Sequence, residues 1–143
     1  MRNSLIAVAT LMALSGCGRV APDAVTDPVE VRRLARVTVP PSASGLQCRT
    51  QCGIDRLTYG RFDIPTGDLP AVLEWMPGGG RVGPYAGYSH VTSHQMGEAW
   101  WQPGQLRQPR VAEWSEPSFS VNLMFGESGQ PGTVTVYFFN FEM

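Results

Sequence analysis

The chain has 143 residues and nearly balanced charge, with 11 basic residues, all of them Arg, against 12 acidic residues. This balance gives no electrostatic basis for binding nucleic acid or a strongly acidic partner. The 16 glycines and 12 prolines favour short elements joined by many turns over a bundle of long helices.

The N-terminus has the organisation of an export signal. Arg2 precedes an apolar run over residues 5–14, which is interrupted only by Thr10. The run is too short to span a bilayer as a mature helix, but it has the length of a secretory signal core. The four residues that end this segment resemble the lipobox of bacterial lipoproteins: Leu14, Ser15, Gly16 and Cys17.

The lipobox resemblance implies a membrane-anchored product. It places cleavage between Gly16 and Cys17, so residues 1–16 are the signal peptide, and Cys17 carries acyl chains on its thiol and its new amino group. Two or three chains make attachment durable, whereas one anchors marginally. Gly18 stands where an Asp is associated with inner-membrane retention, so the resemblance favours the outer membrane of a Gram-negative bacterium, with the protein facing the periplasm. The alternatives are an ordinary signal peptide with an incidental cysteine and a buried N-terminal helix.

Residues 17–36 are expected to be a lipidated N-terminus and tether, with a possible short helix over residues 28–36. Asp27 suits an N-cap, Pro28 suits the first helical position, and Glu30 stands where a capping-box carboxylate would be. Three arginines would lie near one side of this helix, next to the anchor, where they could contact anionic headgroups. They are Arg32, Arg33 and Arg36. A solvated helix face or an extended segment is the alternative.

Two cysteines, Cys48 and Cys52, remain for the exported domain. A disulfide between them is the expectation for an oxidising compartment. A redox pair normally has two intervening residues and begins a helix, whereas this pair has three and is followed by Gly53.

Residues 37–143 are predicted to form a single globular domain. Short strands are expected over residues 37–39 and 57–64, because both stretches are rich in β-forming residues and end at proline. A helix is expected after a cap at Asp68, with one apolar face and an end at the Pro77 turn. That face consists of Leu69, Val72, Leu73 and Met76. Residues 78–87 are expected to be loop, and residues 109–115 a short strand.

The C-terminus predicts a β-hairpin. Residues 118–125 and 133–141 alternate apolar and polar side chains, and the residues between these two stretches are typical of a turn. One face of the hairpin must be buried, and the helix over residues 71–76 is its expected cover. The fold class is therefore α+β: a small, mainly antiparallel sheet with a C-terminal hairpin and one or two short helices packed on it. Residues 39–143 also resemble small bacterial lipoproteins with no assigned activity.

His90 and His94 are the candidate metal ligands. On a helix they would lie one turn apart, with Glu98 or Met96 as a further ligand. However, the residues between them favour a strand, and no further His or Cys completes a known pattern. Two histidines on a polar surface are the preferred interpretation, so no metal or cofactor is expected.

Four tryptophans supply candidate contact residues. Trp75 and Trp114 are expected in the core, while one of the adjacent Trp100 and Trp101 would point outward if they lie on a strand. No nucleophile motif and no paired carboxylates argue for catalysis. The sequence therefore favours a non-enzymatic binding module with a protein or cell-wall partner. A metal-binding protein that uses His90 and His94 and an envelope immunity or inhibitor protein are the alternatives, and a strongly diverged hydrolase is a third.

Overall fold

The computed structural model describes residues 22–76 and 80–143, and it contains a seven-stranded sheet in which every neighbouring pair is antiparallel. The spatial order is β1-β2-β3-β7-β6-β5-β4. The last two strands in sequence therefore lie near the centre. The strands are β1 (Asp23–Ala24), β2 (Ser44–Cys52), β3 (Arg56–Pro65), β4 (Arg81–Pro84), β5 (Arg107–Glu116), β6 (Phe119–Glu127) and β7 (Thr133–Glu142).

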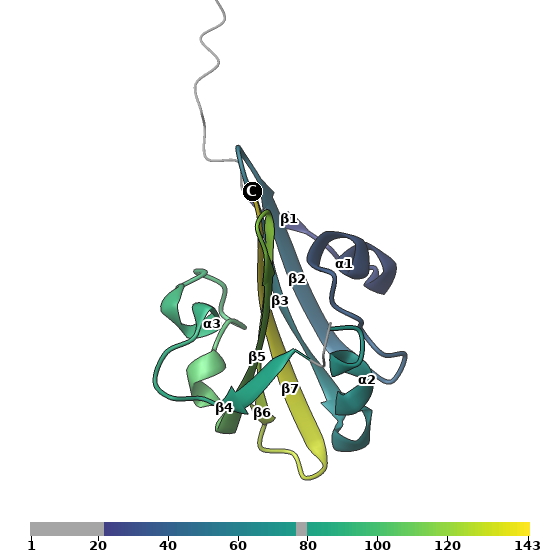
Figure 1. Ribbon diagram of the computed structural model, residues 1–143. Helices are drawn as coiled ribbons and strands as arrows, with labels where there is room; N and C mark the ends of the chain where they lie inside the picture. The colour runs from purple at the N-terminus through teal and green to yellow at the C-terminus, as the bar shows by residue number, and fades with distance from the viewer. Residues whose placement is uncertain (1–21, 77–79) are drawn as a thin grey trace, which may run out of the picture.

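Short helices cover both faces of this sheet (Figure 1). Helices α1 (Pro28–Ala35) and α2 (Leu69–Leu73) lie on one face, with a 3₁₀ turn, η1 (Thr66–Asp68), leading into α2. Helix α3 (His90–Ser93) and the 3₁₀ turn η3 (Pro103–Gln105) lie on the opposite face. The sheet is thus the middle layer of three.

Both faces of the central strands are buried, which gives two cores. Val121 and Leu123 of β6 belong to the core under α1 and α2, together with Phe138 of β7. Met124 and Tyr137 belong to the core on the α3 side. Because side chains alternate along a strand, each central strand feeds both cores. The expectation that one hairpin face is buried under a single helix is therefore incomplete.

The predicted fold class is confirmed in its coarser part. The structure has a mainly antiparallel sheet, the C-terminal hairpin and short helices packed on it. The α-helices contain eight, five and four residues, so the fold is dominated by its sheet to a degree that the label α+β does not describe.

The possible helix over residues 28–36 is present as α1. The Asp27 side chain accepts a hydrogen bond from the Val29 amide at 2.9 Å, and Pro28 occupies the first turn as predicted. Glu30 does not form a capping box, because its carboxylate accepts hydrogen bonds from Arg33 at 2.7 and 3.0 Å. The buried side of α1 packs into the core, and Val25 before it is buried as well. Val25 and α1 therefore pack with the domain, although they lie in the segment over residues 17–36 that was predicted to be a tether.

Other local predictions were wrong. Residues 37–39 are not a strand, although Val37 is fully buried, and β2 and β4 form where no strand was expected. Asp68 does not cap α2; its carboxylate instead accepts a hydrogen bond from the Ser42 hydroxyl. The apolar face of the predicted helix is correct, since Val72 and Met76 are buried in the core, but α2 itself ends at Leu73.

The predicted disulfide is absent, because Cys48 and Cys52 are both free thiols in strand β2. Four residues along a strand separate their Cα atoms by about 13 Å. A disulfide requires a Cα separation below about 7 Å. The sequence spacing was compatible with a bridge in a turn, whereas the register of β2 against β3 keeps this segment extended.

The two thiols are expected to differ sharply in reactivity. Cys52 is exposed, whereas Cys48 is buried, and burial raises the pKa of its thiol to about 12. Alkylation with iodoacetamide at pH 8 should therefore modify Cys52 under native conditions and Cys48 only after unfolding, because the thiolate is the nucleophile. Peptide mass mapping measures both sites, and equal native labelling would contradict the burial of Cys48.

The predicted signal peptide, residues 1–16, and the predicted lipid attachment site, Cys17, lie outside the described residues. Within residues 22–76 and 80–143, no helix is both long and apolar enough to cross a membrane.

Candidate functional site

Helix α3 places both histidines above the sheet. Ser89 caps the helix: its hydroxyl accepts a hydrogen bond from the Val91 amide at 3.1 Å. Val91 is fully buried in the α3-side core and fixes this single turn to the sheet. His90 and His94, at the two ends of the turn, remain exposed. The ring of His94 stacks on Phe139 of β7, with 4.4 Å between centroids and 25° between planes.

Strand register aligns a row of side chains across the sheet beneath α3. Arg81 of β4 pairs with Glu113 of β5, which pairs with Asn122 of β6, which pairs with Phe139 of β7. Directly opposed residues share one face of a sheet. These four side chains therefore form a line that passes from charged through polar to aromatic.

A second row runs beside the first. Ser115 of β5 pairs with Ser120 of β6, which pairs with Phe141 of β7, which pairs with Leu57 of β3. This row also changes from polar to apolar side chains along its length. Its polar side chains, here hydroxyl groups, lie on β5 and β6, and its apolar side chains lie on β7 and β3. The two rows together give the sheet a polar half and an apolar half under α3.

Two adjoining hollows occupy these rows. One, of about 370 Å³, has an apolar floor and both histidines at its edge. The other, of about 410 Å³, is lined by the polar half of the rows and by Arg81 and His90. They share His90, Ser120 and Asn122, so they adjoin each other. We call the two hollows together the α3 groove; its lining residues used below are Leu57, Arg81, His90, His94, Glu113, Ser120, Asn122, Phe139 and Phe141.

Local polar contacts hold the His94 ring in place. Its Nδ1 lies 3.0 Å from the carbonyl oxygen of His90, which only accepts hydrogen bonds, and 3.0 Å from the Ser93 hydroxyl, which can donate or accept. The carbonyl oxygen of His94 accepts a hydrogen bond from Trp101 Nε1 at 3.1 Å, which ties the end of α3 to the following loop.

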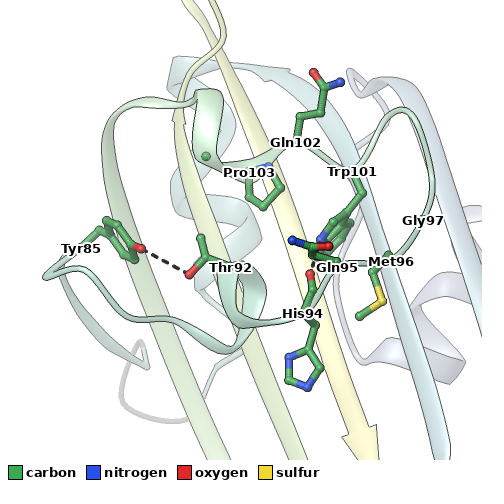
Figure 2. A pocket seen from close by; sticks show the side chains of 10 residues that line it. Tyr85, Thr92, His94, Gln95, Met96, Gly97, Trp101, Gln102 and Pro103 are labelled. Carbon is green, nitrogen blue, oxygen red and sulfur yellow. Dashed lines mark hydrogen bonds between the residues drawn. The ribbon is translucent and has the colours of Figure 1, made fainter.

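A further hollow, of about 480 Å³, lies on the other side of His94 (Figure 2). Met96 and Trp101 line it from the loop after α3, and Tyr85 lines it from the end of β4. Figure 2 shows the hydrogen bond between the Tyr85 and Thr92 hydroxyls, which are 3.3 Å apart. His94 is thus a wall between this hollow and the α3 groove.

The tryptophan predictions are partly confirmed. Trp75 and Trp114 pack against the core in an edge-to-face pair, with ring centroids 6.4 Å apart. Of the candidate contact pair, Trp101 is buried at 8% exposure, so it is not a surface contact. Trp100 is half-buried and stacks on Tyr59 with 6.0 Å between centroids. Both rings mainly support the loop that follows His94.

The metal hypothesis places Glu98 or Met96 beside the two histidines, and Met96 lines the hollow of Figure 2 together with His94 but not His90. His90 and His94 do border one hollow, but Glu98 forms an ion pair with Arg49 at 3.1 Å instead of joining them. Across the described part of the chain, no three His, Cys, Asp or Glu side chains are grouped so that they could hold a metal ion.

The groove also contains a serine, a histidine and a carboxylate, namely Ser120, His90 and Glu113. Activation of a serine requires a hydrogen bond from its hydroxyl to the histidine. The Ser120 hydroxyl accepts a hydrogen bond from the Asn122 amide at 3.3 Å, and no hydrogen bond joins it to His90 among the described residues.

Most groove residues were not singled out from the sequence. Arg81, Glu113 and Ser120 come from three strands, and only the register places them together. One signal was available: Asn122 interrupts an otherwise apolar stretch of β6, and a buried polar residue in such a position often has a specific partner.

No family model matches the chain, and no curated protein or solved structure shows significant similarity to it. Its function is therefore inferred from the lipobox resemblance and from the geometry of the α3 groove.

Proposed function

We propose that this protein is a lipid-anchored, periplasm-facing binding protein of the outer membrane, and that the α3 groove is its ligand site. The protein acts by binding, without catalysis, and its ligand comes from the cell envelope, as a protein or cell-wall component. Cys17 supplies the anchor in this proposal.

The observation that carries the binding part is the amphipathic order of the two rows under α3. Ligand sites combine a largely apolar surface with a few polar groups that fix orientation. The groove has an apolar half at Phe139, Phe141 and Leu57, and polar groups at one end. The exposed large apolar residues elsewhere in the described chain are scattered singly, which is normal for a protein surface. They are Val29, Ile54, Tyr88 and Met143.

Cys17→Ser is expected to abolish membrane attachment, because serine offers no thiol for acylation. The full chain, expressed in a Gram-negative host, should sediment with the membranes and have an intact mass that begins at Cys17 with added acyl chains. The variant should lack this mass and leave the membrane fraction on detergent-free extraction. Cys52→Ser is the matched control and should remain lipidated. An unmodified soluble wild-type chain would contradict the anchor.

Hydrogen–deuterium exchange tests the binding site. The extracted full chain, in detergent, is incubated with and without a detergent-solubilised envelope extract that contains both proteins and cell-wall fragments. Slower exchange is expected at residues 89–94 and in the parts of β5 and β6 that line the groove, because a bound ligand stabilises the state it binds. Protection confined to the opposite, α1–α2 face would contradict the assignment of the site.

A further inference from the structure

One polar side chain of the α3 groove is held in place by the fold and still has an unused hydrogen-bonding atom. Asn122 of β6 lines both hollows, although it is only 4% exposed. Its Nδ2 donates to the carbonyl oxygen of Phe139 at 3.0 Å and to the Ser120 hydroxyl at 3.3 Å. Because a carbonyl oxygen only accepts, the contact with Phe139 fixes which end of the side-chain amide is the nitrogen.

The unused atom is Oδ1 of Asn122. Within residues 22–76 and 80–143, no hydrogen bond reaches it. It also differs from the side-chain atoms of these residues that are shielded from solvent without a partner, which are Nε of Arg56, Nε of Arg61 and Nε1 of Trp75. Oδ1 is therefore open to the groove. A polar group held in a buried side chain normally has a partner, and here a ligand can supply it.

A hydrogen-bond donor lies next to this acceptor. The Ser120 hydroxyl accepts from Asn122, so its own proton is available, and no described residue receives it. One ligand hydroxyl can use both groups, since its oxygen donates to Oδ1 and accepts from Ser120. A trans peptide group cannot do so from one edge, because its N–H and C=O point in opposite directions. The two groups therefore favour a hydroxyl group over a peptide group.

The other polar side chains of the groove are suited to the same kind of ligand. Glu113 accepts hydrogen bonds when ionised, Arg81 only donates, and His90 can do either. A ligand with a single charge is attracted by Glu113 or Arg81 and repelled by the other. Hydroxyl groups donate to a carboxylate and accept from a guanidinium without carrying charge. Because both side chains are exposed, hydroxyl groups at different positions of one ligand can reach them.

The apolar half of the groove fits the face of a sugar ring. Phe141 and Leu57 are paired across β7 and β3, and both are half-buried, so each exposes part of its side chain. Phe141 pairs with no other aromatic ring of the described residues, whereas His94 stacks on Phe139. A sugar ring has hydroxyl groups at its edge and C–H groups on its faces. The hollows, about 410 and 370 Å³, are each of the size of small-ligand sites.

From these contacts we propose that the α3 groove binds a saccharide, with a ring hydroxyl between Asn122 Oδ1 and the Ser120 hydroxyl and a ring face on Phe141. This inference rests on the proposed function, since it names the ligand class of the same groove. The envelope has two sources of saccharide: cell-wall glycan, whose sugars are N-acetylated, and oligosaccharides built from hexoses without acetyl groups.

Nuclear magnetic resonance titration of the isotope-labelled full chain tests the ligand class. The detergent has no sugar headgroup, since such a headgroup would compete. The probes are diacetylchitobiose and cellobiose, which differ in their acetamido groups. Signals of Ser120, Phe141 and the Asn122 side-chain amide should shift, with a dissociation constant of about 0.1 to 10 mM, the weak range expected for an open polar site. Tighter binding of diacetylchitobiose assigns the ligand to cell-wall glycan, and tighter binding of cellobiose assigns it to the hexose source.

Two variants test the two contacts. Ser120→Ala should weaken binding about fivefold, as expected for the loss of one neutral hydrogen bond. Phe141→Ala should weaken it about tenfold, because it removes the apolar surface under the ring. Ser128→Ala and Ile54→Ala are the matched controls and should bind like the wild type, because both residues are exposed and neither lines the groove. Thermal unfolding verifies that each variant is folded.

Salt dependence tests the absence of charge on the ligand. Binding should change by less than about twofold between about 20 and 500 mM NaCl, because an uncharged ligand makes no ion pair for salt to screen.

The inference would be overturned if neither disaccharide shifted the groove signals of a folded chain, or if either variant left binding unchanged. If the disaccharides fail while envelope extract still protects the groove from exchange, the proposed function stands and the ligand class is wrong. If neither reaches the groove, the site itself is wrong.

Discussion

Gly60→Ala is expected to be the most damaging single-methyl change in the described chain. A Cβ atom at this position would lie 2.4 Å from the backbone oxygen of Gln47 and 2.4 Å from Cζ of Phe138. The first contact involves strand β2, which is paired to β3 at this point, so it cannot be relieved by a side-chain rotation. The second involves a fully buried ring in the larger core. The expected loss in the free energy of unfolding is about 3 kcal/mol.

Urea denaturation followed by tryptophan fluorescence measures this loss. Gly83→Ala is the matched control: Gly83 also lies in a strand, but a Cβ atom added there would meet nothing within 4 Å beyond its immediate chain neighbours. The control should change stability by less than about 0.5 kcal/mol. Equal effects of the two substitutions would show that Gly60 is not closely packed between β2 and β7.

Asn140→Leu is expected to have the second largest effect. Asn140 is buried, and its Nδ2 donates a hydrogen bond to the carbonyl oxygen of Ala35 at the end of α1. Its Oδ1 accepts a hydrogen bond from the backbone amide of Asn122 at 3.3 Å. Leucine has a similar volume but leaves both partners without this hydrogen bond. Since each buried orphaned group costs about 1–3 kcal/mol, the expected loss is about 2–4 kcal/mol.

The location of the damage distinguishes this prediction from a general loss of stability. Native-state hydrogen exchange should accelerate most in α1, because the substitution removes the side-chain hydrogen bond between β7 and the end of that helix. Gln130→Leu, in the exposed hairpin turn, is the control and should leave exchange in α1 unchanged. Uniform acceleration across the whole sheet would contradict a local role for Asn140.

The parts of the fold that sequence reasoning predicted are those with local signals. The alternation in residues 118–125 and 133–141 predicts β6 and β7, and Asp27 followed by Pro28 predicts the start of α1. Each of these signals lies within about ten residues and depends on the chain's own periodicity or caps.

The elements that escaped prediction depend on distant partners. Strand β2 has polar residues at most positions, such as Gln47 and Gln51, and it is extended because it pairs with β3. The disulfide prediction failed for the same reason, since Cys48 and Cys52 follow the register of β2. The hairpin's own sequence also does not show that both of its faces are buried. The second face is buried because residues 85–106, which come earlier in the chain, pack over it.

The candidate site was predictable only at its two histidines. Their closeness to each other follows from sequence spacing, but the groove beneath them is built from residues of several strands. Pairings such as Asn122 with Phe139 join residues that are separated by a hairpin, and Arg81 reaches the same row through two further pairings. The register of the strands, which decides which residues lie opposite one another, cannot be read from a single sequence.

The two outer strands of the sheet are short: β1 has two residues and β4 has four. Their length affects how neighbouring copies of the protein can contact one another when they are close together. Proteins attached to a membrane are confined to a plane, where neighbours meet edge to edge far more often than in free solution. A long open strand at the rim of a sheet would then offer backbone groups for pairing with a neighbouring copy. Here β1 and β4 each cover only part of the neighbouring strand, and β4 ends at Pro84, which has no amide hydrogen to donate. If the protein is anchored as proposed, a neighbouring copy therefore meets an interrupted edge and no single continuous strand.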